Sequence, residues 1–487
     1  MEALDIVIRN GTVVTAVDRF QADVGICGEQ VVAIARDLPP GAREIDARGM
    51  LLMPGGIDSH CHIEQRSSAG IVCADDFYTA TVSAAFGGTT TVIPFAAQHR
   101  GDSLREVVNA YHECARPKAV IDYAFHLIVT DPTPQVLGQE LPALVREGYT
   151  SLKVYMTYDL LKLSDYDILN VLASARREGA MVMVHAENHD VIRWLSDRLL
   201  AAGHRAPRYH AVAHARIAEG EATHRAISLS ELLDVPLLVV HVSAKEAIDE
   251  IRNAQTKGLR IYGETCPQYL FMTAADMDLP DMEGAKYCCS PPPRDAQAQE
   301  AVWRGLANGT FQVMSSDHAP YRFDESGKLA NGPNASFKEI AMGVPGLELR
   351  LPLLYSEGVR TGRIDIHQFV ALTATNAAKI YGLHPRKGTI AIGADADIAI
   401  WDPEREITIN HDMLHDNAGY TPYEGRRITG WPVTVLSRGR VVVDDGALNA
   451  ARGSGVFLRC DSPASAQPAG NPVIELDPGQ NFGAQLL

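Results

Sequence analysis

The sequence lacks the features that would place it in a membrane or outside the cell. Its 487 residues contain no uninterrupted run of about 18 apolar residues, the length that a helix needs to cross a bilayer. Residues 1–5 have neither the basic region nor the apolar core of a signal peptide. The 8 cysteines form no CxxC pair and no regular framework, so we expect free thiols in a reducing compartment. These absences predict a cytoplasmic protein.

Positive charge is also scarce. Lys and Arg number 44 against 60 Asp and Glu, which gives a formal net charge of −16. An acidic surface repels phosphate groups, so we expect neither nucleic acid nor an anionic membrane as a partner. The hydrophobic fraction of 46% and the aromatic fraction of 7% are ordinary for a soluble globular protein.

Short apolar runs separated by turn residues occupy both ends of the chain. These runs are 5–8, 24–26, 31–34, 397–401, 433–436 and 440–443. Two β-rich ends around a different middle predict one small β-sandwich domain built from residues 1–52 and 386–460. Residues 461–487 are rich in Pro, Ala, Gly and Ser. They predict a C-terminal tail that is mobile or lies on a neighbouring subunit.

Strand and helix patterns alternate through the middle of the chain. The expected strands are the apolar runs 51–62, 89–95, 121–129, 151–156, 181–186, 236–242, 260–264 and 312–317. Helical stretches lie between them, among them 104–114, 165–178, 219–233 and 244–257. Eight strands with intervening helices predict an α/β fold in which residues 53–385 form a (β/α)8 TIM-like barrel.

Potential metal ligands lie near the ends of these strands. They are His60, His62, Lys153, His185, His241 and Asp317. Alone, each has an ordinary explanation: a packed histidine, a salt-bridged lysine, or an aspartate that caps a helix. Barrel active sites, however, are built at the carboxyl ends of the strands, and residues two apart on a strand point the same way. The combination therefore predicts a metal site.

Seven short motifs also resemble those of a known family. The motifs lie at 54–58, 87–90, 184–188, 263–270, 289–292, 316–318 and 420–425. Together they are similar to the cyclic amidohydrolases of the amidohydrolase superfamily, and within them to the dihydropyrimidinase or D-hydantoinase branch. The resemblance runs from about residue 4 to residue 459.

The resemblance implies a centre of two zinc ions. The buried zinc would be held by His60, His62 and Asp317, and the exposed zinc by His185 and His241. Lys153, carboxylated on its side chain, would bridge the two ions. An unmodified ammonium would be repelled by two dications, whereas a carbamate offers one oxygen to each. Metal binding lowers the pKa of water to about 7, so the implied nucleophile is a metal-bound hydroxide.

The resemblance also implies roles around the substrate. Asp317 would take the proton of the hydroxide and pass it to the leaving nitrogen, and Tyr155 would stabilise the oxyanion. Ser290 and the backbone near Met342 would hold the amide edge of the ring. The implied reaction opens cyclic ureides, namely 5,6-dihydropyrimidines and hydantoins, to N-carbamoyl amino acids, as in pyrimidine degradation. His318, which follows Asp317, is a candidate for a supporting role.

Two segments depart from the pattern of the family. Met342 stands where relatives usually carry an asparagine, and the loop 64–70 differs from the common version that contains Met-Pro. Because the loop shapes the pocket for the substituent on the ring, the departures bear on substrate preference.

Other members of the superfamily are alternatives. An allantoinase or a cyclic imide hydrolase would use the same metals, but Tyr155 and the overall match favour the first interpretation. Collapsin response mediator proteins share the fold and form non-catalytic tetrameric scaffolds, but they lack the metal ligands that this chain keeps. Relatives are usually tetramers, so we expect a homo-oligomer, tetramer or dimer, with a small cyclic amide as its other partner.

Overall fold

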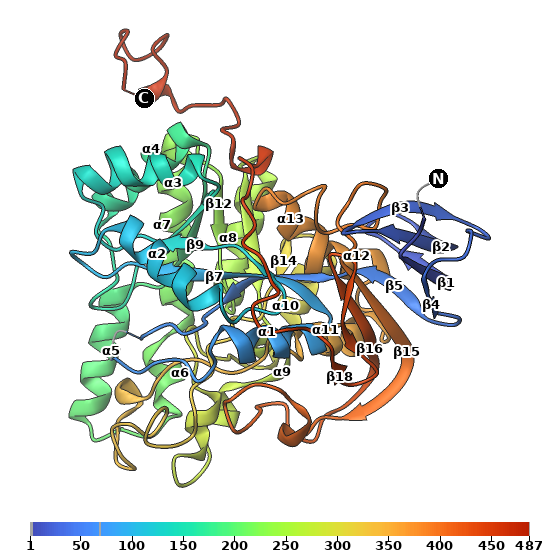
Figure 1. Cartoon of the computed structure of the whole chain (residues 1–487). Helices are drawn as coiled ribbons and strands as arrows, with labels where there is room; N and C mark the ends of the chain where they lie inside the picture. Colours follow the sequence, from blue (N-terminus) through green and yellow to red (C-terminus); the bar gives the residue numbers. More distant parts are fainter. Residues whose placement is uncertain (1–2, 68–69, 487) are drawn as a thin grey trace.

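The strands of the protein form two sheets that lie side by side (Figure 1). The computed structural model describes residues 3–67 and 70–486. The parallel sheet has the order β14-β13-β12-β11-β10-β9-β7-β6, with β8 paired to β7. Its strands are β6 (Gly56–Cys61), β7 (Thr89–Ala97), β8 (Asp122–Tyr123), β9 (His126–Ile128), β10 (Ser151–Tyr155), β11 (Met181–His185), β12 (Leu237–Val239), β13 (Ile261–Thr265) and β14 (Val313–Met314).

The two edges of the parallel sheet meet, which closes it into the predicted (β/α)8 barrel. The chain that follows β14 forms a parallel bridge between His318 and Cys61 of β6. The N–H of His62 donates to the carbonyl of His318 at 2.7 Å, and Ser316 Oγ donates to the carbonyl of His60 at 3.2 Å. Closure places the ends of the first and last strands side by side.

Helices surround the barrel and cover the outer faces of its strands (Figure 1). They are α1 (Phe77–Phe86), α2 (Leu104–Ala115), α3 (Leu141–Arg146), α4 (Asp165–Glu178), α5 (His189–Ala201), α6 (Tyr209–Ala213), α7 (Arg216–Leu233), α8 (Lys245–Thr256), α9 (Gln268–Phe271), α10 (Ala296–Ala307), α11 (Arg350–Leu354), α12 (Ile366–Val370) and α13 (Asn376–Ile380). The start and stop signals of α4 are typical: Ser164 accepts from the N–H of Asp167, and Gly179 ends the helix with a φ of 71°.

Side chains of the barrel strands alternate between two buried layers. On β11, Met181 and Met183 belong to the core inside the barrel, whereas Val182 and Val184 belong to the core beneath the helices. Both faces are apolar because both are covered, as is usual for parallel strands. Lys153 of β10 pairs with Met183, so it also points into the barrel. A lysine in this layer must lose its charge or have that charge compensated by a partner, because burying an unpaired charge costs free energy.

The second sheet joins the two ends of the chain. Its strands are β1 (Ile6–Val14), β2 (Arg19–Cys27), β3 (Gln30–Ala35), β4 (Arg43–Asp46), β5 (Leu51–Pro54), β15 (Ile398–Thr408), β16 (Arg427–Ser437), β17 (Arg440–Asp444) and β18 (Ala447–Leu448). Most of its pairings are antiparallel, and its strands enclose a core of their own. The expected strand 51–62 is divided: β5 belongs to this sheet and β6 to the barrel.

The tail begins on the barrel and then leaves it. Ser462 Oγ donates to the carbonyl of Gly179, and Arg260 donates to the carbonyl of Gln467. Farther along, the chain projects away from the body, and Phe482 is exposed there (Figure 1). No helix in the described part of the chain combines the length and the hydropathy needed to span a bilayer.

A buried ion cluster connects the barrel to the second sheet. Lys387 Nζ lies 2.8 Å from Asp122 of β8, 3.0 Å from Asp395 and 2.7 Å from Asp397, which precedes β15. Arg438 adds a second cation, 3.0 Å from Asp122. Burial acts to lower the pKa of Lys387, but the three carboxylates outweigh it and raise the pKa above its usual range. The lysine is therefore charged, and it balances carboxylates from both parts of the molecule.

Replacing Lys387 with methionine is expected to destabilise the protein by about 3–5 kcal/mol, because breaking a buried ion pair leaves uncompensated charge. The urea dependence of unfolding measures the effect. Arg43→Met provides the control, since Arg43 pairs with Asp444 at an exposed position of the same sheet. That variant should lose at most about 1 kcal/mol. Equal losses in the two variants would mean that the cluster does not fasten the two parts together.

Candidate metal centre

The six predicted ligands meet at the carboxyl ends of the barrel strands. Three of them form the tightest group: His60 lies in β6, His62 follows that strand, and Asp317 follows β14. Asp317 Oδ1 lies 3.2 Å from His60 Nε2 and 3.3 Å from His62 Nε2. One ligand atom from each of the three lies within 4.8 Å of the others, a spacing that suits a metal ion.

The remaining three residues lie around this group. Lys153 Nζ is 2.9 Å from His60 Nε2. The ring of His241 has its centroid 5.3 Å from that of His60 and 4.4 Å from that of His185, which ends β11. The structure therefore brings all six residues to one place, although they come from five different strands or strand ends.

Acceptor groups for which the sequence predicted no role orient three of the four imidazoles. The pairs are His60 Nδ1 with Glu264 at 2.5 Å, His62 Nδ1 with Gln65 at 2.7 Å, and His185 Nε2 with Glu187 at 2.8 Å. These contacts leave the other nitrogen of each ring for a metal, the usual arrangement of ligand histidines. Among the described residues, His241 Nδ1 has no hydrogen-bond partner although it is buried. The donor set fits a metal centre.

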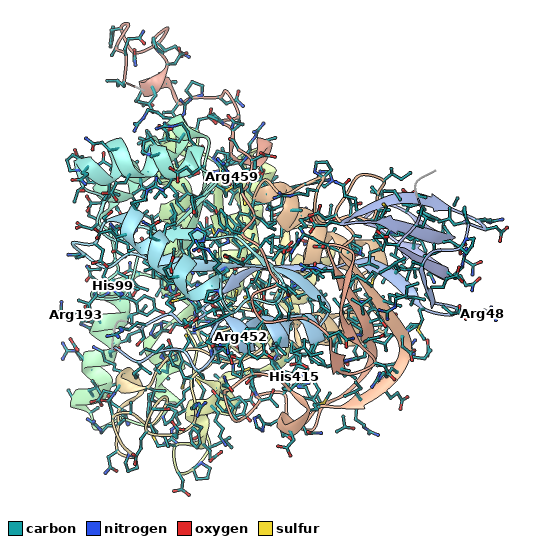
Figure 2. All side chains as sticks on the ribbon, in the orientation of Figure 1. Arg48, His99, Arg193, His415, Arg452 and Arg459 are labelled. Atoms are coloured by element: carbon teal, nitrogen blue, oxygen red, sulfur yellow. The ribbon has the colours of Figure 1, made fainter. Side chains whose placement is uncertain are left out.

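A cavity of about 230 Å³ opens over these residues. Its wall contains five of the six ligand residues, together with Tyr155, Ser290 and Met342. A larger cavity of about 640 Å³ lies next to it, and Tyr158 and Lys338 border both. In Figure 2, His99 of the smaller cavity and Arg193 of the larger one lie on the opposite side of the molecule from Arg48, which is in the turn between β4 and β5.

The three expected substrate contacts occupy different positions on this wall. The ring of Tyr155 stacks against His185, with 5.5 Å between their centroids. Ser290 Oγ lies 3.2 Å from His210 Nε2, and it also hydrogen-bonds to Tyr158. Met342 is half-buried. In the divergent loop 64–70, residues 65–67 line the cavity, and residues 68–69 lie outside the described part of the chain.

A sequence profile of the amidohydrolase family matches residues 51–442. The chain belongs to this family. It is 45% identical to the D-hydantoinase of Rhizobium radiobacter over 457 residues, which cover 94% of this chain and 99% of that protein. It is 44% identical to the D-hydantoinase of Ralstonia pickettii, with the same coverage. The crystal structure of dihydropyrimidinase from Brevibacillus agri NCHU1002 aligns with a TM-score of 0.92 at 46% identity, covering 94% of this chain and 99% of that one.

Electrostatics at the centre of this amidohydrolase favour a bound cation. Burial and Lys153 act to lower the pKa of His60, but the carboxylates of Glu264 and Asp317 outweigh them and raise it. These carboxylates attract positive charge between the rings, whether a proton or a metal cation. Burial lowers the pKa of His241 well below its usual range, which keeps this ring in the neutral form that binds metals.

The amidohydrolase backbone is strained at two of the candidate ligands. His241 has a φ of 40° and Asp317 a φ of 49°, values that non-glycine residues rarely adopt. Such conformations cost about 1–3 kcal/mol each and persist only where the surrounding structure holds them. Strain at two residues that face the same cavity supports a functional role for their exact placement.

Proposed function

We propose that this amidohydrolase opens the ring of cyclic ureides, 5,6-dihydropyrimidines and hydantoins, to N-carbamoyl amino acids. The convergence of four histidines, Lys153 and Asp317 at the mouth of the barrel carries the proposal. The names of its relatives, D-hydantoinase and dihydropyrimidinase, supply the class of ring. A scaffold protein without catalytic activity does not need four histidines, a lysine and an aspartate arranged in this geometry.

We further propose two zinc ions per chain, bridged by a carboxylated Lys153. His60, His62 and Asp317 would hold one ion, and His185 and His241 the other. Burial lowers the pKa of Lys153 to about 8, so a substantial fraction of the amine is neutral near that pH. Only a neutral amine can add to carbon dioxide: its lone pair forms the N–C bond, a carbonyl π bond opens, and a proton leaves to solvent. No carboxylate among the described residues forms an ion pair with Lys153, so its charge lacks a direct partner.

The chain's own residues supply the rest of the chemistry. When bound, the metal polarises the scissile carbonyl and lowers the pKa of water. One carboxylate oxygen of Asp317 accepts the proton of the attacking water, and the carboxyl returns it to the ring nitrogen as the C–N bond breaks. The hydroxyl of Tyr155 donates to the carbonyl oxygen as it gains charge. Ser290 and the backbone at Met342 hold the amide edge of the ring.

A turnover panel tests the proposal. Protein loaded with zinc and bicarbonate is assayed with dihydrouracil, hydantoin, 5-substituted hydantoins, allantoin and succinimide, and its zinc is measured by elemental analysis. We expect about two zinc ions per chain and hydrolysis of the dihydropyrimidine and the hydantoins. Turnover of allantoin or succinimide alone would assign the chain to another branch of the superfamily. Full activity without bound metal would refute the proposed centre.

Replacing Tyr155 with phenylalanine is expected to lower kcat by about 10²–10³-fold, the usual loss when one donor to an oxyanion is removed. Zinc content should stay unchanged, because the Tyr155 hydroxyl is not a ligand. Tyr321→Phe is the matched control, since Tyr321 lines the same cavity and is buried but has no proposed role. Equal losses in the two variants would mean that the effect is one of packing.

We also propose a cytoplasmic homo-oligomer, a tetramer or a dimer. Large apolar side chains stand exposed on neighbouring helices and on the tail, among them Trp194, Ile217 and Phe482. Burying such residues in a subunit interface would remove apolar surface from water. Among the described residues, Cys61, Cys73, Cys114, Cys266, Cys288, Cys289 and Cys460 are free thiols, which is consistent with a reducing compartment. Sedimentation analysis of the full chain and of a chain that ends at residue 470 would test the contribution of the tail.

A further inference from the structure

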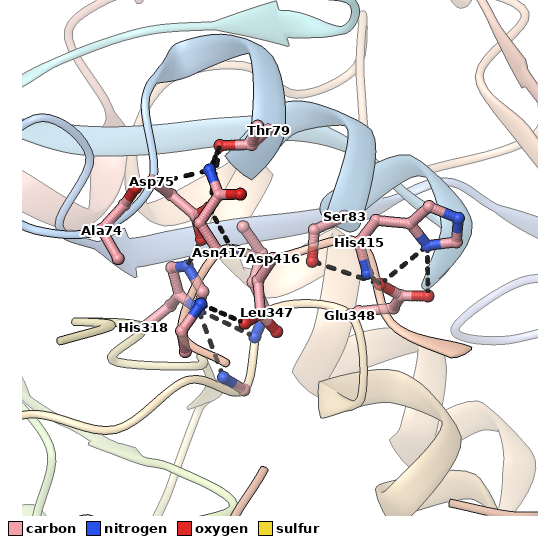
Figure 3. A network of polar contacts seen from close by, with 12 residues as sticks. Ala74, Asp75, Thr79, Ser83, His318, Leu347, Glu348, His415, Asp416 and Asn417 are labelled. Atoms are coloured by element: carbon pink, nitrogen blue, oxygen red, sulfur yellow. Dashed lines mark hydrogen bonds and ion pairs between the residues drawn. The ribbon is translucent and has the colours of Figure 1, made fainter. Parts of the chain in front are cut away.

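A buried polar network centres on His318, the residue that follows Asp317 in the chain (Figure 3). His318 Nε2 lies 2.9 Å from Asp75 Oδ2. On the other side of the ring, the N–H groups of Gly346 and Leu347 face Nδ1 at 3.2 and 3.3 Å. Because two donors face Nδ1, that nitrogen accepts, and the proton of the ring is on Nε2. The ring therefore has a single orientation that satisfies all its partners.

The same residue connects the strands that hold the ligands. The carbonyl of His318 accepts from the N–H of His62, and His318 forms bridges with Cys61 and Val344. His318 thus joins the end of β6 to the loop that carries Met342. Its neighbour Asp317 has the strained φ of 49°, and a residue in this conformation depends on its neighbours to hold it.

The network is anchored from the second sheet. Asp75 Oδ1 accepts from the N–H of Asn417 at 2.9 Å and from Thr79 Oγ1 at 2.8 Å. The side chain of Asn417 donates to Thr79 Oγ1 and to the carbonyl of Ala74. Asn417 lies in segment 409–426, which connects β15 to β16 and contains the motif 420–425 that the proposed chemistry does not use. The segment 409–426 between two strands of the second sheet is therefore hydrogen-bonded to Asp75, which in turn contacts His318, the residue next to Asp317.

We propose that Asp75 and Asn417 act through His318 as positioning residues for Asp317 and for the loop at Met342. The inference rests on the proposed function. None of the three lies on the wall of either cavity, so they do not touch the substrate. Asp75 and His318 have no exposed surface, and a fully satisfied buried network of this kind fixes one arrangement of its members. Residues that support metal ligands in this way typically contribute about 10–100-fold to metal affinity or activity.

A second network in the same place provides a matched control. Glu348 accepts from Ser83 Oγ at 3.3 Å and from the N–H of His415 at 3.0 Å (Figure 3). Glu348 is buried, and His415 belongs to the same 409–426 segment as Asn417. Among the described residues, no hydrogen bond or ion pair joins the side chains of this second network to His318 or Asp317. Glu348→Gln therefore perturbs a buried polar group of the same region without touching the chain of contacts to Asp317.

The test compares Asp75→Asn with Glu348→Gln in the zinc-loaded full-length protein. An asparagine must place its NH2 group either against His318 Nε2–H or against the N–H of Asn417, so a donor faces a donor at one end of the amide. In D75N we expect kcat to fall about 10–100-fold with KM little changed, and zinc to be released to a chelator about 10–100-fold faster. E348Q should resemble the wild type in both. In a double-mutant cycle, His318→Asn should cost little once Asp75 is replaced.

The outcomes separate this inference from the proposed function. A wild type that turns over no cyclic ureide would refute the function, whereas zinc release would still report on the network. Equal zinc release and equal kcat in D75N and E348Q would overturn the positioning role. Should D75N fail to fold, Asn417→Ala replaces it, because Asn417 is only half-buried and its loss removes the Ala74 and Thr79 contacts. Wild-type zinc release in that variant would equally contradict the proposal.

Discussion

Asp317→Asn is expected to reduce kcat by about 10²–10⁴-fold while the fold stays intact. General acid–base catalysis typically contributes a rate acceleration of this size. Burial acts to raise the pKa of Asp317, but His60 and the hydrogen bonds from His60 and His62 lower it well below its usual range. The carboxylate is therefore ionised at neutral pH, so its oxygens are free of a proton before the water attacks. An asparagine has the same shape but can neither accept nor return the proton.

The measurement is kcat on the best substrate of the panel, with zinc content determined on the same sample. Because Asp317 is also a proposed ligand, the comparison holds only for fully metallated protein. Asp159→Asn is the matched control, since Asp159 lines the neighbouring cavity and pairs with His189 at an exposed position. Near-normal turnover by a metallated D317N would place the proton shuttle elsewhere.

The barrel could be predicted, and its candidate ligands could be singled out, because their signals are local. The uninterrupted apolar run of β11 marks a strand buried on both faces, and a titratable residue at its end, His185, then stands out. The same holds for His60 and for His241, which lies two residues after the end of β12. The rule that barrel sites form at the carboxyl ends of strands converts such positions into neighbours without any knowledge of the contacts.

The break in the strand expected at 51–62 falls at Pro54-Gly55-Gly56, a local turn signal inside an otherwise apolar run. The requirement for glycine at the break comes from a neighbouring strand. A Cβ at Gly55 would lie 2.2 Å from Thr90 Oγ1, so the chain passes this point only as glycine. The requirement comes from Thr90, which is distant in sequence, and no periodicity within residues 51–62 contains it.

The supporting residues were unpredictable for a related reason. Asp75 and Asn417 are 342 positions apart, and each is an ordinary polar residue in its own segment. Glu264 and Gln65 likewise acquire their roles only when His60 and His62 turn toward them. A candidate ligand can be recognised in the sequence by its residue type and its place at the end of a strand. A residue that hydrogen-bonds to a ligand can be recognised only once the fold has brought the two together.

Lys153→Ala should abolish the proposed metal pair, and activity should fall by more than the roughly 10–100-fold loss typical when a residue that merely supports a ligand is removed. The reason is that the bridge itself disappears, together with its negative charge. Alanine at this buried position also leaves a space that a small carboxylic acid can enter. Acetate or propionate added with zinc should therefore restore part of both the zinc content and the turnover.

A second buried lysine makes the experiment specific. Lys328 has no exposed surface, and burial lowers its pKa to about 8, as for Lys153. Its Nζ donates to the carbonyl of Cys288 at 2.8 Å, away from the ligands. Lys328→Ala should lower stability but keep its zinc, and added carboxylic acid should not affect its turnover. The mass of the zinc-loaded wild type, measured under native conditions, should exceed that of the bare chain by two zinc ions and one carbon dioxide. An unmodified Lys153 in an active, metal-loaded enzyme would overturn the bridge, because an ammonium held against two dications has no source of compensating charge.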